Sequence, residues 1–73
     1  MGVRSNLRVF RTNRGLSVRK LGEMTGIHFT YIAAFERGRM NPTLDEVERL
    51  CRALRVTVED IYPDPEVRRT VVG

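Results

Sequence analysis

The sequence has one cysteine, Cys51, no tryptophan and only three prolines among its 73 residues. A single cysteine excludes an intramolecular disulfide framework, so packing or oligomerisation has to stabilise a chain this short. No apolar run approaches the roughly 20 residues that a membrane span needs, and residues 1–6 contain no apolar signal core. We therefore expect a cytoplasmic protein with no membrane contact.

Groups that could perform catalysis are equally scarce. The sequence contains one histidine, no close Cys–His pair, no cluster of metal ligands and no glycine-rich loop of the phosphate-binding kind. Cys51 falls on an apolar helical stripe, where a free cysteine commonly packs as a small hydrophobic residue. The sequence therefore predicts neither an enzyme nor a metal or cofactor site.

Acidic residues are rare in the first part of the chain. Residues 1–42 hold eight basic groups against two acidic ones, whereas residues 43–73 hold five basic groups against seven acidic ones. A basic half joined to a mildly acidic half suggests that one face meets a polyanion such as nucleic acid. The alternative is a solvated surface in an arginine-rich protein, and charge alone does not separate the two.

Turn signals divide the chain into five short helical segments, which predicts an all-α fold. The expected helices span about residues 4–13, 18–25, 28–37, 44–55 and 57–61. Ser17 is a good N-cap for the second helix, and Thr43 with Glu46 forms a capping box for the fourth. Residues 1–62 should form one domain. Residues 63–73 show no helical period and predict a tail, mobile or associated with a dimer, in which residues 70–72 could pair as a strand.

The segment 18–37 carries the most information about function. Its two helices are joined by Gly26-Ile27-His28, which is too short for an antiparallel hairpin, so the helices must cross steeply as in a helix-turn-helix. Gly22 in mid-helix costs about 1 kcal/mol relative to alanine, which predicts a close approach of the following helix. Gly26 suits the turn, because a positive φ is cheap only for glycine.

Several short motifs follow one another over about residues 4–62: Arg11-Thr-Asn-Arg-Gly15-Leu-Ser17, Leu21-Gly-Glu23, Gly26-Ile27, Tyr31-Ile32, Phe35-Glu36-Arg37-Gly38 and Asn41-Pro42-Thr43-Leu44. In this order and spacing they resemble the XRE/Cro-type helix-turn-helix family of phage repressors and bacterial regulators. The resemblance implies a five-helix, repressor-like domain of bacterial or phage origin, whose second and third helices form the DNA-reading pair.

The resemblance also implies an ion pair between Arg11 and Glu36. The residues agree with it, because Glu36 follows Phe35 on an otherwise apolar turn and burying an unpaired carboxylate there would be costly. The alternative is an exposed Glu36 with no partner.

By the same resemblance, the third helix should enter the major groove and present five outward residues to the bases. These are Phe29, Thr30, Ala33, Ala34 and Arg37. Phe and Ala stand where family members often carry Gln or Arg, and they offer no bidentate hydrogen bond. We therefore expect readout through thymine methyl groups and through Thr30. A packing role is the alternative for Phe29.

A second set of residues is expected to contact the phosphate backbone. Its members are Arg11, Arg14, Ser17, Arg19, Lys20, His28, Tyr31 and Arg39. Backbone amides at the helix starts behind Ser17 and His28 attract phosphate, whereas Val18 stands where the family usually has a phosphate-binding glutamine. Each basic residue of the set could equally be a solvated surface charge.

These expectations favour a sequence-specific regulator of transcription that binds double-stranded DNA as a homodimer on a pseudo-palindromic operator. The expected dimer surface consists of Val56, Val58, Ile61 and Tyr62, extended by Val67, Val71 and Val72. Two alternatives are an antitoxin, which would also bind a toxin or other regulatory protein, and an interaction module on the same fold that has lost base readout. The apolar face formed by Phe29, Ala33 and Ala34 motivates the second alternative.

Overall fold

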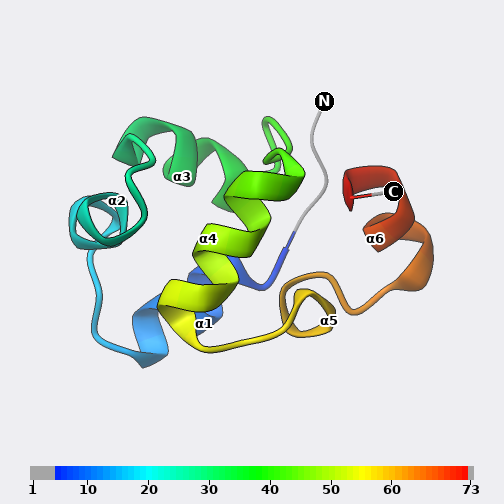
Figure 1. Cartoon of the computed structure of the whole chain (residues 1–73), viewed down its shortest axis with the longest axis horizontal. Coiled ribbons are helices and arrows are strands. Elements are labelled where there is room, and N and C mark those ends of the chain that lie inside the picture. The colour runs from blue at the N-terminus through cyan, green and yellow to red at the C-terminus, as the bar shows by residue number, and fades with distance from the viewer. Residues whose placement is uncertain (1–4, 73) are drawn as a thin grey trace.

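The computed structural model describes residues 5–72, except for the side chain of Val72, and forms a small helical bundle (Figure 1). Its elements are α1 (Leu7–Asn13), α2 (Val18–Thr25), α3 (Phe29–Glu36), α4 (Leu44–Leu54), α5 (Val58–Ile61) and α6 (Pro65–Val72). No strand occurs within the described residues. The all-α class is confirmed: α1 to α5 are the five expected helices, and the described residues contain a sixth helix, α6, that was not expected.

Side-chain caps start the helices where the sequence predicts them. The Ser17 hydroxyl accepts a hydrogen bond from the Lys20 amide at 3.0 Å and opens α2. At α4 the Glu46 amide donates to the Thr43 hydroxyl and the Thr43 amide donates to the Glu46 carboxylate. Such reciprocal bonds satisfy two amides that the helix itself leaves unpaired. The expected start of α1 at Arg4 lies outside the described residues; α1 begins at Leu7, after Ser5 and Asn6.

A single core lies between the helices, and α4 runs through the middle of the molecule (Figure 1). Its buried members come from every helix of the described chain except α6: Leu7, Leu21, Ile27, Ile32, Phe35, Val47, Leu50, Cys51, Leu54, Ile61 and Tyr62. Burial raises the pKa of the Cys51 thiol, and the charges of Asp60 and Glu59 raise it further. A thiol with a raised pKa forms little thiolate and is unreactive, which agrees with a packing role.

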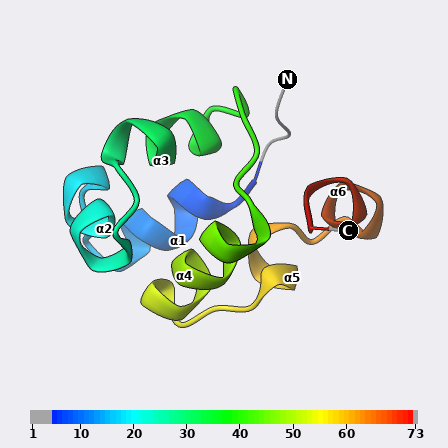
Figure 2. The same cartoon turned by 45° about the horizontal axis from the view of Figure 1, so that its top comes forward.

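The C-terminal segment departs most from expectation. Residues 65–72 form α6, which lies at the end of the molecule away from α2 in both views (Figures 1 and 2). The Asp64 carboxylate accepts from the Glu66 amide at 2.9 Å, and Val67 and Val71 pack against the core. The expectations of a segment without helical structure and of a strand at residues 70–72 are therefore wrong.

The predicted dimer surface is also wrong in part, because some of its residues are buried. Ile61 is 3% exposed and Tyr62 is 1% exposed, so the chain's own core covers both side chains and neither is available to a second copy. Val56 and Val58 are half-buried and pack on the same core, and the side chain of Val72 lies outside the described residues. The apolar residues that suggested a partner are largely covered within the chain.

Candidate nucleic-acid interface

The joint between α2 and α3, which consists of Gly22 and the turn at residues 26–28, is sterically tight, as the sequence predicts. A Cβ atom added at Gly22 would lie 2.8 Å from the Ile27 carbonyl oxygen and 3.3 Å from the Phe29 amide nitrogen. Gly26 has a φ of 75°, and its amide donates to the Gly22 carbonyl at 2.8 Å. Figure 1 shows α2 end-on while α3 runs across the view, so the two helices cross steeply.

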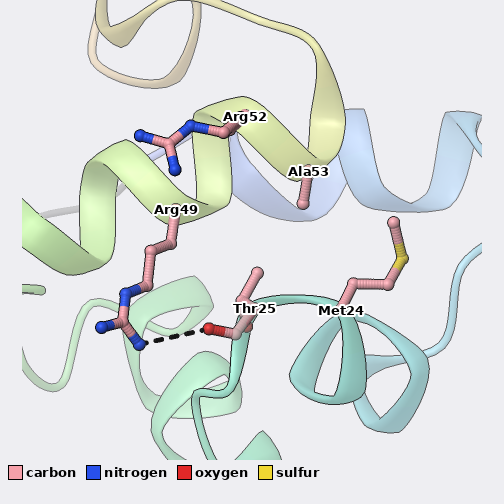
Figure 3. Close-up of a pocket in the computed structure, with 5 residues that line it drawn as sticks. All are labelled: Met24, Thr25, Arg49, Arg52 and Ala53. Carbon is pink, nitrogen blue, oxygen red and sulfur yellow. Dashed lines mark hydrogen bonds between the residues drawn. The ribbon is translucent and has the colours of Figure 1, made fainter.

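A hydrogen bond from α4 supports this joint from outside (Figure 3). The Arg49 Nη1 atom donates to the Thr25 carbonyl oxygen at 3.4 Å, and the Arg49 Nε atom pairs with Asp45 at 2.9 Å. Thr25 and Arg49 border a hollow of about 360 Å³ together with Met24, Arg52 and Ala53. Sequence reasoning missed this contact, because 24 residues separate its partners and no local pattern connects them.

The predicted pair of Arg11 and Glu36 is present and bidentate. Arg11 Nε lies 2.6 Å from Glu36 Oε2 and Arg11 Nη2 lies 3.0 Å from Glu36 Oε1. Arg11 Nη1 also donates to the Leu16 carbonyl at 2.7 Å. The side chains are only 12% and 7% exposed, and the hydrogen bond to Glu36 raises the pKa of Arg11. With so little of its guanidinium exposed, Arg11 joins α1 to α3 and is poorly placed to bind phosphate.

The five residues predicted to read bases share one side of α3. Thr30 and Arg37 are exposed, and Phe29, Ala33 and Ala34 are half-buried. The buried side of the helix carries Ile32 and Phe35, which are 0% and 1% exposed. α3 therefore presents an outward face that is poor in hydrogen-bonding groups, as the sequence predicts.

The first turn of α3 is organised by contacts among its own residues. His28 caps the helix, since its Nδ1 atom accepts from the Thr30 amide at 3.3 Å and lies 2.8 Å from the Thr30 hydroxyl oxygen. The His28 ring stacks on the Phe29 ring, with centroids 4.7 Å apart. The Arg19 guanidinium of α2 lies over the same Phe29 ring, 4.1 Å from its centroid. The packing role considered for Phe29 is thus realised, through a contact with Arg19 that the sequence did not reveal.

The residues expected to bind phosphate surround this face without forming one cluster. Ser17, Arg19 and Lys20 lie at the start of α2, His28 and Tyr31 at the start of α3, and Arg39 in the loop after α3. Tyr31 is 51% exposed. Arg14 is less free, because its guanidinium lies over the Phe10 ring and donates to the Phe10 carbonyl at 3.3 Å.

Arg8 is a further cation that the sequence did not assign. It borders a hollow of about 280 Å³ together with Val18, Ala33 and Arg37 and the pair of Arg11 and Glu36. Val18 packs against the core here and brings no polar group to the hollow. Since Glu36 is already paired, the positive charges of Arg8 and Arg37 are left unbalanced beside α3.

Metal and membrane sites are not found in the part of the chain that the structure describes. None of its His, Cys, Asp and Glu side chains gather in a group of three or more that could hold a metal ion. None of the helices between residues 5 and 72 has the length and apolar character needed to cross a bilayer.

Comparison with known proteins decides the family. The sequence model of the family described as Helix-turn-helix matches residues 7–61. The chain belongs to the XRE-type helix-turn-helix family. This assignment agrees with the tight joint between α2 and α3 and confirms the resemblance drawn from the motifs.

Relatives with similar sequences carry names of regulatory proteins. The chain is 36% identical over 63 residues to a hypothetical transcription factor of Neisseria meningitidis and covers 86% of its own length and 59% of that protein. It is 40% identical over 53 residues to the control protein C.SmaI of Serratia marcescens, with coverage of 73% and 63%. The chain thus spans about three fifths of the length of each of these relatives.

A solved structure shares the helix-turn-helix fold. The crystal structure of the hypothetical transcription factor NHTF from Neisseria superimposes with a TM-score of 0.74 at 34% sequence identity. The similarity covers 92% of this chain and 77% of that one. The shared region therefore extends over nearly all of the described helices.

Proposed function

We propose that this chain binds double-stranded DNA with α3 in the major groove and thereby regulates transcription. The observation that carries the proposal is the outward face of α3, held at a steep angle by the tight joint and accompanied by exposed cations. A helix-turn-helix uses this geometry to place the first residues of its second helix against base edges. The names of the similar proteins from Neisseria and Serratia support the regulatory part.

Cations around α3 supply most of the affinity in this proposal. Arg8, Lys20, Arg37 and Arg39 are exposed, and the amides at the starts of α2 and α3 add donors for phosphate oxygens. A protein that neutralises about five phosphates shows a log–log salt slope of about −4 to −5. Base readout is modest by comparison, because Ala33 and Ala34 can offer only methyl contacts, and Thr30 is the one hydroxyl on the face.

A salt titration of DNA binding tests the proposal. We expect binding to random duplex DNA at about 50 mM salt that weakens steeply as the salt concentration rises. Arg39→Ala should weaken binding to all sequences alike, whereas Thr30→Ala should change the preference at one position. If the chain binds no duplex DNA even at about 50 mM salt, the proposed function is wrong.

We further propose that two copies bind a pseudo-palindromic site. Half-sites one helical turn apart would place the two α3 helices about 34 Å from each other. Met40 and Leu44, which follow the end of α3, are 38% and 52% exposed. We propose that these side chains meet those of a second copy, so that the two α3 helices lie on the same side of the dimer.

Sedimentation of a double variant tests this dimer surface. Met40→Glu with Leu44→Glu should shift a dimer at about 100 μM towards monomer, because charges buried at an interface are costly. Met24→Glu is the matched control, since Met24 is 47% exposed but belongs to α2 and borders the hollow beside α4. Equal dissociation by both variants, or a monomeric parent protein, would contradict the proposed surface.

The alternative of a pure interaction module has less support. It depended on an apolar face at Phe29, Ala33 and Ala34, but these three residues are half-buried. The guanidinium of Arg19 also covers the Phe29 ring, so the face offers little free apolar surface to a protein partner.

A further inference from the structure

The stack of Arg19 on Phe29 places a charged, planar group beside the first turn of α3, at the edge of its outward face. Arg19 is in the first turn of α2 and Phe29 is the first residue of α3, so the stack bridges the two helices of the motif. The centre of the guanidinium lies 4.1 Å from the ring centroid. We infer that Arg19 is a base-reading residue that contacts guanine and is positioned by Phe29; this inference rests on the proposed binding of DNA.

The hydrogen-bonding edge of Arg19 is free. Within residues 5–72 the Arg19 guanidinium has no hydrogen-bond or ion-pair partner. Its neighbour Lys20 differs, since Lys20 Nζ lies 3.7 Å from the Glu23 carboxylate. Stacking uses only the flat face of the guanidinium, whereas its N–H groups lie in the plane and point outward from its edge. The stack therefore fixes the plane of the group and leaves its donors available.

A planar pair of donors held in a fixed orientation fits the acceptor edge of guanine. Guanine presents O6 and N7 side by side in the major groove, and a bidentate arginine is its commonest specific contact. A phosphate can also accept both donors of an arginine, so position decides between the two: Arg19 stacks on Phe29, the first residue of the helix proposed to enter the groove. The surroundings agree with a reading role, because Arg19 and Phe29 border a hollow of about 400 Å³ at the turn that also includes Gly22 and His28. The hollow, which Glu23 also lines, leaves open space beside the guanidinium for a base edge.

This arrangement also explains the unusual face of α3. Phe29 cannot form a bidentate hydrogen bond itself, but its ring supports a residue of α2 that can. The hydrogen-bonding capacity missing from α3 is thus supplied by the preceding helix. The joint fixes the distance between Arg19 and Phe29. Position 22 must carry a small residue for the Phe29 backbone to lie as close to α2 as it does.

Selection of bound sites from a random DNA pool, followed by a double-mutant cycle, tests the inference. The parent protein should select a guanine at one fixed position of each half-site, and Arg19→Ala should lose that preference while the other positions persist. Replacing the selected guanine by 7-deazaguanine removes the N7 acceptor. The parent protein should then bind about tenfold more weakly, and Arg19→Ala should be insensitive to the replacement, so that the two changes are coupled.

Two further variants separate base reading from charge and from folding. Arg39→Ala also removes one exposed arginine and should respond to 7-deazaguanine as the parent does. Phe29→Leu keeps apolar bulk but removes the ring, and it should reduce the guanine preference while Arg19 remains present. If Arg19→Ala weakens random and selected DNA equally and shows no coupling to 7-deazaguanine, Arg19 binds phosphate and the inference is overturned. Absence of any DNA binding by the parent protein would instead overturn the proposed function and this inference with it.

Discussion

The joint between α2 and α3 and the end formed by α5 and α6 are built in opposite ways. At the joint, backbone atoms lie so close to Gly22 that one added carbon would meet the Ile27 carbonyl at 2.8 Å. At the other end, Val67 and Val71 are half-buried against the core, and Arg68 donates to the Tyr62 carbonyl at 3.0 Å. Backbone contacts leave no space for an added atom at the joint. The end formed by α5 and α6 is held mainly by half-buried apolar side chains. Substitutions should therefore have abrupt effects in the first and proportionate effects in the second.

The largest effect should come from breaking the ion pair behind the joint. Glu36→Ala leaves the guanidinium of Arg11 buried without its partner, which should lower the free energy of unfolding by about 3 kcal/mol. The matched control is Glu66→Ala in α6, whose pair with Arg69 is more than 70% exposed on both sides and contributes little. Urea denaturation of both variants measures the difference. Similar losses would show that burial does not distinguish the two pairs.

A single methyl group at Gly22 should have the next largest effect. Gly22→Ala improves helix propensity, but its Cβ would meet backbone atoms that can move only if the turn moves. We expect a net loss of about 2 kcal/mol, together with weaker DNA binding because α3 is displaced. Glu23→Ala on the adjacent exposed position should stay within about 0.5 kcal/mol of the parent. A stabilised Gly22→Ala protein would contradict the tight joint.

Removing apolar volume from α6 should have a smaller and isolated effect. Val67→Ala deletes two half-buried methyl groups and should cost about 1 kcal/mol. Since α6 lies at the end of the molecule away from α2 (Figure 2), affinity for DNA should not change. Thermal denaturation and a binding titration on the same sample measure both quantities. A loss of DNA affinity without a loss of stability would place α6 in the interface.

The smallest effect at neutral pH concerns Tyr62. Burial raises the pKa of its phenol from about 10 to about 12, partly opposed by a hydrogen bond with Ser5. The folded chain therefore holds this proton more tightly than the unfolded chain, so the stabilisation is complete below pH 10 and is lost as the pH rises towards 12. Urea denaturation between pH 9 and 12 should show the decline, and Tyr62→Phe should reduce it. An equal decline in both proteins would assign it to other groups.

The sequence predicts those features that local chemistry determines. Ser17 and Thr43 start α2 and α4 as expected, and Gly22 revealed the close approach of α3 because a glycine in mid-helix needs a steric reason. α6 has a comparable local signal in the sequence: Asp64 before Pro65 is an N-cap followed by proline at the first helical position. Val67 and Val71 then follow at a spacing of four residues. The missed helix was therefore predictable.

The remaining features depend on residues that are far apart along the chain. The contacts of Arg49 with the Thr25 carbonyl and of Arg19 with the Phe29 ring follow from the packing of whole helices. Neither leaves a trace in local periodicity. The pair of Arg11 and Glu36 was expected only because of the family resemblance, since spacing alone does not connect residues 25 positions apart. Placing Ile61 and Tyr62 on a dimer surface failed for a related reason, because the sequence cannot tell which apolar residues their own core covers.

The hydrogen bond from Arg49 to the Thr25 carbonyl has a consequence for engineering. A side chain of α4 supports the turn, and Arg11 of α1 anchors the end of α3. The helix-turn-helix therefore cannot be transferred to another protein by itself. Grafting residues 18–37 onto another scaffold would transfer the residues proposed to read bases without Arg11 and Arg49, which hold α3 and the turn in place. The segment to transfer runs from α1 through α4. Any redesign of its DNA preference should keep Arg11 and Arg49 together with the residues of α3.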